Sequence, residues 1–214
     1  MFPNFNAKDF DFFMALCFIG KEKGRARIRI TFEEISFLIG KKYKDYRRFF
    51  NEIDSFSQKM MSVTTKEKRI QEEGFRTSIY GSFFEKIVIK EEERFLLVQF
   101  GSEVLFLLNN LTNNYTQFEL REFCSLKSKY SKRLYMFLMQ YLFKGEFIIQ
   151  KESLWDILDL NAKSISLQEN SFQRKILAPA FNELKGIFKT LECLKQKSNS
   201  RGNPIISFKF VFSK

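Results

Sequence analysis

The sequence predicts an α+β protein built from two tandem winged-helix (wHTH) domains, each a three-helix core with a β-wing. Three observations support this prediction. The order helix, strand, two helices and β-hairpin occurs twice along the 214 residues. With 44% hydrophobic side chains, the chain can bury two cores of roughly 100 residues each. The excess of basic over acidic residues lies almost entirely in the second half.

The first domain begins with a helix and a short strand. Asn6, followed three residues later by Asp9, marks the start of the helix, which we expect to end near Gly20. Charged and apolar residues alternate over residues 27–30, and this alternation predicts the strand.

Two helices and four β segments complete the first domain. Thr31 and Glu34 form a capping box that opens the second helix, and Gly40 closes it. The third helix has apolar side chains every three or four positions from Phe49 to Met60. We expect an enlarged wing from the β-prone segments at residues 61–65, 75–80, 83–90 and 95–100.

The boundary between the domains is expected at residue 116, which gives domains 1–116 and 117–214. Before it, residues 102–109 have a helical pattern and residues 109–116 are polar. After it, residues 118–126 predict a helix that leads directly into the second domain. We therefore expect a short connection rather than a long tether.

The second domain repeats the same order of elements. Its helices are predicted at residues 129–142, 153–160 and 172–184, and its wing strands at residues 191–195 and 205–212. Asn170 or Ser171 can cap the third helix. The buried side of that helix should comprise Phe172, Ile176, Leu177, Ala180, Phe181, Leu184 and, beyond its end, Phe188.

The wing of the second domain encloses the polar segment QKSNSRGNP. Along its second strand, alternate residues from Ile206 to Phe212 share one phase, so we expect them to be buried. Ser207 and Lys209 should then point outward.

The distribution of charge indicates a polyanionic partner. Residues 127–214 carry 16 Lys and Arg against 7 Asp and Glu, a net charge of +9, whereas residues 1–126 carry a net charge of only +2. Lysine and arginine side chains that displace counterions from phosphates supply the sequence-independent part of DNA affinity. The alternative is a basic surface that only keeps the protein soluble.

Duplex DNA is the polyanion that a winged helix suits, because the first turns of its third helix enter the major groove. Arg174 and Lys175 are the best candidates there, since arginine can form two hydrogen bonds with a guanine edge. The predicted DNA-binding residues are Lys129, Arg133, Ser171, Arg174, Lys175, Asn182, Lys195, Lys197 and Arg201. A weaker secondary patch is predicted at Lys41, Lys42, Lys44, Arg47 and Arg48, diluted by Glu52 and Asp54.

Pro179 lies inside the predicted third helix of the second domain. Proline lacks a backbone donor, so we expect the helix to bend or loosen near Lys175. The bend either aims the first turns into the groove or accommodates packed neighbours.

Several classes of enzyme are excluded by what the sequence lacks. The chain has no histidine, so it cannot hold a metal with paired histidines and nick DNA with a tyrosine. It also lacks the glycine-rich loop with Lys and Ser or Thr that binds ATP phosphates. We therefore predict no enzyme activity and assign no catalytic residue, no metal and no cofactor.

The cysteines and the chain start indicate an intracellular protein. Cys17, Cys124 and Cys193 are far apart and flanked by apolar residues, which is typical of buried free thiols. No apolar run reaches the roughly 18 residues that a membrane-spanning helix needs, and the first residues lack the pattern of a signal peptide. We expect a cytoplasmic location and no membrane partner.

Three segments carry a resemblance to a known family. LKSKYSKRLYMFLMQYL (126–142), SLWDILDL (153–160) and FQRKILAPAFNEL (172–184) closely resemble the C-terminal half of the Rep_3 family of plasmid replication initiators. Tyr130, Ser131, Arg133 and Tyr135 match the family's Y-S-x-R-L-Y signature, where contact with a phosphate and local packing are both open. The first domain is similar mainly in its order of elements.

The resemblance implies that the protein acts in DNA replication by binding and assembly, without catalysing a reaction of its own. Rep_3 initiators bind repeated origin sequences, called iterons, help to open an adjacent AT-rich region, and recruit the host initiator and replicative helicase. Dimers formed through the first domain repress the initiator's own gene. The low net charge and many aromatic residues of the first domain suit such a protein contact.

Three alternatives remain open. The closest is a transcriptional regulator with two winged helices and no role in replication, because fold alone does not fix function. The others are an enzyme that cuts the origin and a protein-only scaffold.

Overall fold

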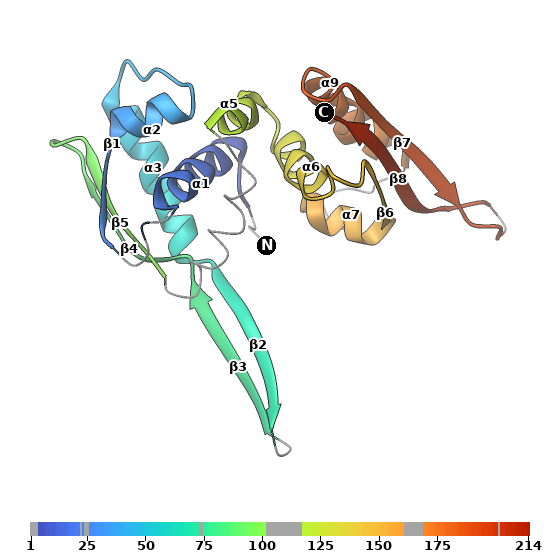
Figure 1. Ribbon diagram of the computed structural model, residues 1–214, viewed down its shortest axis with the longest axis horizontal. Helices are drawn as coiled ribbons and strands as arrows, with labels where there is room; N and C mark the ends of the chain where they lie inside the picture. The colour runs from blue at the N-terminus through green and yellow to red at the C-terminus, as the bar shows by residue number, and fades with distance from the viewer. Residues whose placement is uncertain are drawn as a thin grey trace. The chain divides into compact units, whose positions relative to one another are not determined.

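The computed structural model describes residues 4–21, 23, 26–72, 75–101, 117–160, 169–200 and 202–214. The chain forms two compact units (Figure 1). Lys8–Ser125 is the first unit. Leu126–Lys214 is the second unit, and the residues before Lys8 are grouped with it.

The boundary between the units differs from the one expected at residue 116. Helix α5 (Gln117–Ser125) belongs to the first unit, because it contacts helix α2 (Phe32–Leu38). The guanidinium carbon of Arg121 on α5 lies 4.6 Å from the ring centre of Phe37 on α2. The predicted helix is therefore present, but it packs with the first domain, which no local pattern indicated.

The remaining elements of the first unit follow the predicted order. They are α1 (Ala7–Gly20), β1 (Ile28–Thr31), α3 (Tyr46–Met61), β2 (Thr64–Glu72), β3 (Phe75–Ser82), β4 (Phe84–Lys90) and β5 (Phe95–Phe100), with α2 between β1 and α3. The capping box of α2 is confirmed: the Thr31 backbone donates to the Glu34 carboxylate at 2.6 Å, and the Glu34 backbone donates to the Thr31 hydroxyl at 3.1 Å. Strands β1, β5 and β4 form one antiparallel sheet in that order.

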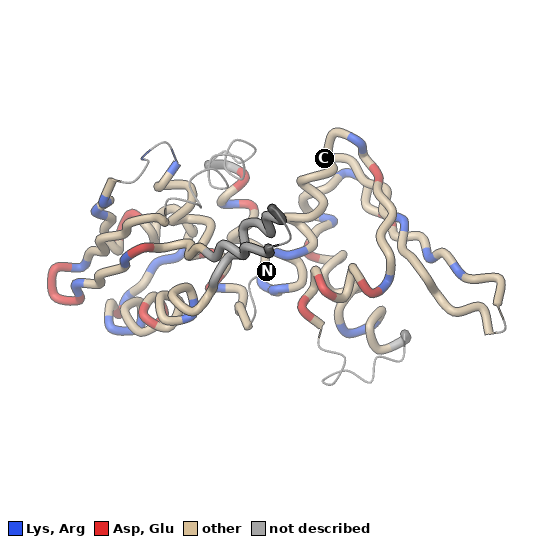
Figure 2. Tube along the Cα trace, turned by 90° about the horizontal axis from the view of Figure 1, so that it is seen from below, with Lys and Arg blue, Asp and Glu red and all other residues tan. Residues whose placement is uncertain are grey.

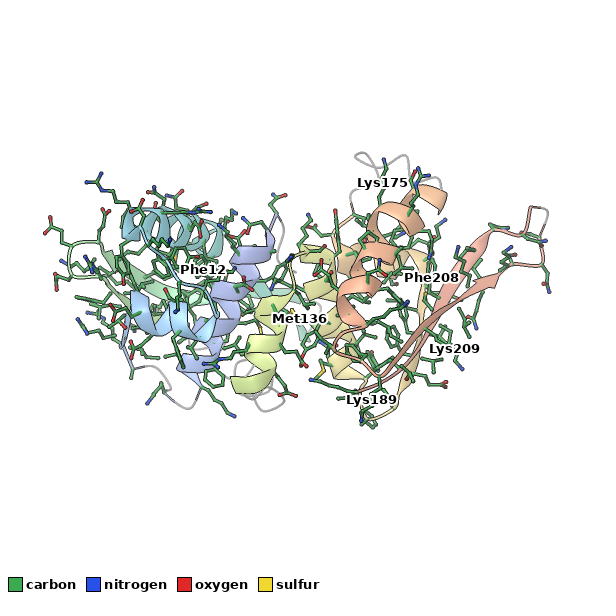
Figure 3. The ribbon with its side chains drawn as sticks, turned by 90° about the horizontal axis from the view of Figure 1, so that it is seen from above. Phe12, Met136, Lys175, Lys189, Phe208 and Lys209 are labelled. Carbon is green, nitrogen blue, oxygen red and sulfur yellow. The ribbon has the colours of Figure 1, made fainter. Side chains whose placement is uncertain are left out.

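Aromatic rings hold the helices of the first unit together. The ring centre of Phe12 on α1, labelled in Figure 3, lies 5.7 Å from the ring centre of Phe49 and 5.8 Å from that of Phe56, both on α3. Phe32 on α2 lies 4.6 Å from Phe49. All four side chains are at most 1% exposed, so these contacts form the core of the unit.

The wing of the first unit is smaller than expected. Strands β4 and β5 are the wing strands, whereas β2 and β3 form a two-stranded sheet of their own that projects as a long hairpin (Figure 1). The prediction of a single enlarged wing was wrong because strand patterns do not specify which strands pair. Helix α3 continues to Met61, so the strand expected from residue 61 begins at Thr64. The helix predicted over 102–109 lies outside the described residues.

The second unit has the same plan as the first. Its elements are α6 (Lys129–Gln140), β6 (Glu146–Gln150), α7 (Lys151–Leu158), α8 (Glu169–Phe172), the π-helical turn η2 (Gln173–Leu177), α9 (Ala178–Leu184), β7 (Thr190–Lys197) and β8 (Ile205–Ser213). The sheet order β6-β8-β7 corresponds to β1-β5-β4: the first strand pairs with the last strand of the wing. This repeated topology confirms two winged helices.

The core of the second unit lies between its helices and one face of this sheet. Phe147 on β6 stacks on Phe210 on β8, with ring centres 4.9 Å apart. Leu134 and Leu138 on α6 are fully buried. The predicted inward side of the third helix is confirmed except at Phe181, which is half-buried.

One strand departs from its predicted phase. Ile206 is 45% exposed and Ser207 only 3%, the reverse of the expectation, although Phe208, Phe210 and Phe212 are buried as predicted. A bulge explains the change: Gln196 pairs with Ser207, but the next residue of β7 pairs with Ile205, so Ile206 has no partner in the ladder. Lys209 remains half-buried.

Candidate nucleic-acid interface

The third helix of the second unit is one helix in three segments, α8, η2 and α9. We expected Asn170 or Ser171 to cap its start. Both instead lie inside α8, which already includes Glu169, so the prediction of the cap was wrong. The helix was expected to bend or loosen near Lys175, and the π-turn η2, which contains that residue, confirms the loosening.

The outward side of this helix is basic at its first turns. Arg174 and Lys175 are exposed, and no described carboxylate pairs with either of them. In Figure 3 the Lys175 side chain points away from the helix. Asn182 is also exposed, whereas Ser171 is half-buried. The two cations are therefore available to a ligand that approaches the helix from outside.

The inward side of the same turns is anchored in the core. Phe172 is 2% exposed, and its ring centre lies 5.9 Å from that of Phe208 on β8 and 6.5 Å from that of Trp155 on α7. These contacts to a strand and to a second helix fix the position from which Arg174 and Lys175 project.

The wing of the second unit carries the second group of predicted residues. Lys195 and Lys197 are exposed on β7, which extends with β8 away from the helices (Figures 1 and 2). The tip is closed by a hydrogen bond of 2.9 Å from the Ser198 backbone to the Pro204 carbonyl. Arg201 lies outside the described residues.

Two predicted DNA-binding residues on α6, Arg133 and Lys129, contact other parts of the protein. Arg133 is 5% exposed; it donates to the Ile157 carbonyl at 2.9 Å and pairs with Asp159 at 3.3 Å. Burial lowers the pKa of Arg133, and the nearby Asp159 opposes this shift. The structure thus gives Arg133 a packing role, which corrects the expected DNA contact. Lys129 is half-buried, with its ammonium 5.2 Å from the ring centre of Tyr130.

The other signature residues also pack. Ser131 and Tyr135 are fully buried, and Tyr135 makes an edge contact with Phe188 at 6.1 Å. For these positions the structure favours local packing over contact with a phosphate. The sequence left both interpretations open because an aromatic residue beside an apolar face suits either.

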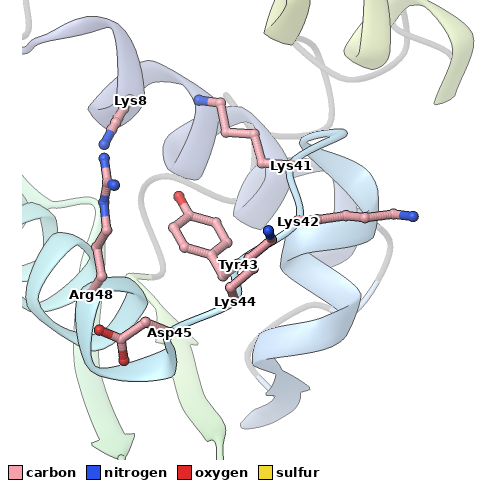
Figure 4. A pocket seen from close by; sticks show the side chains of 7 residues that line it. All are labelled: Lys8, Lys41, Lys42, Tyr43, Lys44, Asp45 and Arg48. Atoms are coloured by element: carbon pink, nitrogen blue, oxygen red, sulfur yellow. The ribbon is translucent and has the colours of Figure 1, made fainter.

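The secondary patch of the first unit surrounds a pocket of about 460 Å³ (Figure 4). Its lining residues are Lys8, Lys41, Lys42, Tyr43, Lys44, Asp45 and Arg48. The three lysines of the predicted patch precede α3, and Arg47 and Arg48 lie in its first turn. Lys8 and Tyr43 were not predicted, because no sequence signal places α1 beside the segment that leads into α3.

Part of this patch is neutralised by carboxylates. Lys41 pairs at 2.5 Å with Asp11, a residue of α1 that is only 1% exposed, and Arg48 pairs at 3.1 Å with Glu52. Glu52 also pairs with Lys8 and accepts a hydrogen bond of 2.8 Å from Tyr43.

These contacts shift two titrating groups. Burial alone would raise the pKa of Glu52, but hydrogen bonds from Lys8, Tyr43 and Arg48 lower it below 4.5. Burial and the neighbouring Glu52 raise the pKa of Tyr43, which therefore stays protonated.

The remaining cations of the patch are open to solvent. Lys42, Lys44 and Arg47 are exposed, and within the described ranges none of them has a carboxylate partner. By contrast, the turn of the first unit's wing is acidic: Glu91, Glu92 and Glu93 are all exposed (Figure 2). Among the described side chains of the first unit, those at the start of α3 therefore suit a phosphate better than those at the turn of the wing.

The cysteines agree with the prediction in part. Cys17 and Cys124 are buried free thiols, and Cys193 is half-buried. Burial raises the pKa of Cys193 to about 12. Over the described ranges, no three metal-ligating side chains come together. No described helix has the length and apolar character to cross a membrane.

Sequence comparison relates the chain to replication proteins. A family model described as "Initiator Replication protein, WH1" matches residues 4–139. The "Probable replication protein rep" of Bifidobacterium longum is 28% identical over 179 residues, which are 84% of this chain and 59% of that protein. The chain thus spans about three-fifths of the length of this relative.

Solved structures share the fold. The Pi initiator protein, determined in complex with iteron DNA, is similar with a TM-score of 0.68 at 16% identity, covering 97% of this chain and 90% of that one. A structure of RctB domains 2–3 is similar with a TM-score of 0.55 at 11% identity, covering 97% and 82%. At these identities the likeness shows the fold alone.

Proposed function

The chain belongs to the family described as Initiator Replication protein, WH1, and from this premise we propose that it is a plasmid replication initiator that binds iterons in duplex DNA. The observation that carries the proposal is the exposed pair Arg174 and Lys175 on the third helix of a winged helix. In addition to this pair, the wing of the same unit carries the exposed Lys195 and Lys197. The related Pi initiator was determined with iteron DNA, which supports the same partner here.

The geometry suggests a division of labour within the second unit. Arg174 and Lys175 enter the major groove, where guanidinium and ammonium groups can bond the O6 and N7 atoms of guanine. The half-buried Ser171, which precedes this pair, and the exposed Asn182, which follows it, assist there. Lys195, Lys197 and Arg201 contact backbone phosphates from the wing, which positions the helix without selecting bases.

The first unit adds a second contact with DNA. Lys42, Lys44 and Arg47 are its exposed cations at the start of α3. Lys41 and Arg48 contribute less, because carboxylates already neutralise them. This patch strengthens binding without specifying sequence.

The protein acts by assembly and not by chemistry. It works in the cytoplasm on plasmid DNA, helps to open the AT-rich segment beside the iterons, and recruits the host initiator and replicative helicase. Dimers that form through the first unit repress its own gene. A chain that stays monomeric at high concentration in analytical ultracentrifugation would contradict this last step.

A footprint of the full chain on the plasmid that encodes it tests the proposal. We expect protection of several tandem repeats beside an AT-rich segment, and its loss in Arg174→Ala/Lys175→Ala. Lys185→Ala, which removes an exposed lysine just after α9, is the matched control and should keep the footprint. A single protected palindrome upstream of another gene would instead indicate the transcriptional regulator, which family membership disfavours.

A further inference from the structure

We propose that the π-turn η2 determines which DNA base Arg174 meets, because its one extra residue rotates Arg174 away from the side of the helix that an α-helix would give it. The inference rests on the proposed function and names the device that sets its specificity. Three observations on the third helix carry it: its hydrogen bonding, the position of Pro179 and the burial of Phe172.

The hydrogen bonding defines the turn. The backbone of Ala178 donates to the carbonyl of Gln173, five residues earlier, where an α-helix would use the residue four earlier. The turn from Gln173 to Leu177 therefore contains about one residue more than an α-helical turn.

Pro179 gives a local reason for the wide turn. In an α-helix the residue at this position would donate to the carbonyl of Lys175. Proline has no such donor, and its ring would clash with that carbonyl. Widening the turn immediately before Pro179 relieves the clash without breaking the helix.

The burial pattern gives a second reason. At about 100° per residue, an uninterrupted α-helix would place Phe172 about 120° from Leu184 and Gln173 only about 20° from it. The phenyl ring of Phe172 would then lie at the flank of the core instead of facing it. One extra residue brings Phe172 to within about 20° of Leu184, and the two side chains are in fact 2% and 0% exposed.

Arg174 turns with this segment. In an uninterrupted α-helix, Arg174 would lie about 80° around the helix axis from Leu184, near the flank of the core. The extra residue rotates Arg174 by up to about 100°, toward the side opposite the core. Its exposure agrees with this position. Because base edges are recognised by direction as well as by charge, the turn sets specificity and leaves the net charge of the helix unchanged.

A one-residue deletion isolates the turn from the side chains. Deleting Gln173 together with Pro179→Ala allows a regular α-helix in which Phe172 and Leu184 still face the core, so the protein should fold. The matched control is Gln173→Ala/Pro179→Ala, which loses the same side chains but keeps the residue count. The probe is a pool of random duplexes, from which the wild-type chain selects its preferred sequence.

We expect the deletion variant to bind random duplex with wild-type affinity and salt dependence, but to lose at least tenfold in its preference for the selected sequence. The control should stay within threefold of wild type. Exchanging the two cations in the deletion variant, Arg174→Lys with Lys175→Arg, returns a guanidinium to the outermost position and should recover most of the preference. A purely structural role of the turn would not produce this rescue.

A deletion variant that keeps the wild-type preference would overturn the inference. If circular dichroism shows that the deletion variant does not fold, Arg174→Lys with Lys175→Arg is tested in the chain without the deletion. This exchange should lower the preference for the selected sequence at least tenfold. An unchanged preference would overturn the inference. A wild-type chain that selects no sequence at all would contradict the proposed function itself.

Discussion

The guanidinium of Arg133 on α6 forms an ion pair with Asp159, 3.3 Å away, directly after the end of α7. The same guanidinium donates to the Ile157 carbonyl at 2.9 Å. Asp159 adopts a left-handed backbone conformation with φ of 57° and caps α7. The arginine therefore joins two helices of the second unit at the point where the chain turns.

Replacing Arg133 with alanine should lower the free energy of unfolding by about 2–3 kcal/mol, because a part-buried carbonyl and a carboxylate lose their donor. Chemical denaturation measures this change. Arg174→Ala is the control, and its effect on stability should stay within about 0.5 kcal/mol because Arg174 is exposed. If Arg133→Ala leaves the stability unchanged, the packing role is wrong, and Arg133 is again a candidate for contact with DNA.

Arg174→Ala or Lys175→Ala should weaken binding to the preferred sequence by about 1–3 kcal/mol, because a base contact is lost. The loss should be confined to one base position when single-base variants of the site are titrated. Binding to random duplex should change much less. Equal losses on all duplexes would show that the assignment of the helix face is wrong.

Salt dependence measures the contribution of phosphates. If about six phosphates are contacted, the logarithm of the binding constant should fall with the logarithm of salt concentration with a slope near −5. Lys197→Ala should weaken all duplexes similarly and reduce the slope by about 1. A binding constant that does not respond to salt would favour a protein-only scaffold.

Lys41 and Lys42 are neighbours with opposite expected effects. Lys41→Ala removes a partner of the buried Asp11 and should cost about 2 kcal/mol of stability. Lys42→Ala should leave stability within about 0.5 kcal/mol and weaken DNA binding modestly. Thermal unfolding and DNA titration of both variants distinguish the stabilising role of Lys41 from the DNA-binding role of Lys42. Equal effects of the two substitutions on stability and on DNA binding would contradict this assignment.

The first unit should lose stability in acid. Glu52 has a pKa below 4.5 in the folded chain, so as the pH falls the unfolded chain binds a proton first. The stabilisation is complete above the unfolded pKa and is lost as the pH falls through the folded pKa. Glu52→Gln should flatten this part of the curve of unfolding free energy against pH. A curve of unchanged slope would show that Lys8, Tyr43 and Arg48 do not stabilise the carboxylate.

Local patterns predicted the elements well, because each depends on neighbours in sequence. The capping box at Thr31 and Glu34 and the buried face from Phe172 to Leu184 are examples. Pairing between distant segments was not predictable in this way. The separate β2–β3 hairpin and the attachment of α5 to the first unit depend on contacts that no periodicity encodes.

The candidate site shows the same limit. The exposure of Arg174 and Lys175 was predicted from the spacing of the apolar residues, but that spacing did not show the π-turn that orients Arg174. Arg133 was assigned to DNA binding, which the structure corrects: its signature suits packing and phosphate contact equally, and only the positions of Ile157 and Asp159 decide between them. Likewise, the sequence placed Ser207 outward, since a bulge at Ile206 depends on the opposite strand.

The acidic turn of the first unit's wing has a consequence for how a polyanion can approach. Glu91, Glu92 and Glu93 repel phosphates at close range, most strongly at low ionic strength. Although both units share one topology, a duplex cannot dock on them in equivalent ways. If phosphates contact Lys195 and Lys197 on the β7–β8 wing, as proposed, the acidic turn between β4 and β5 offers them no equivalent contact.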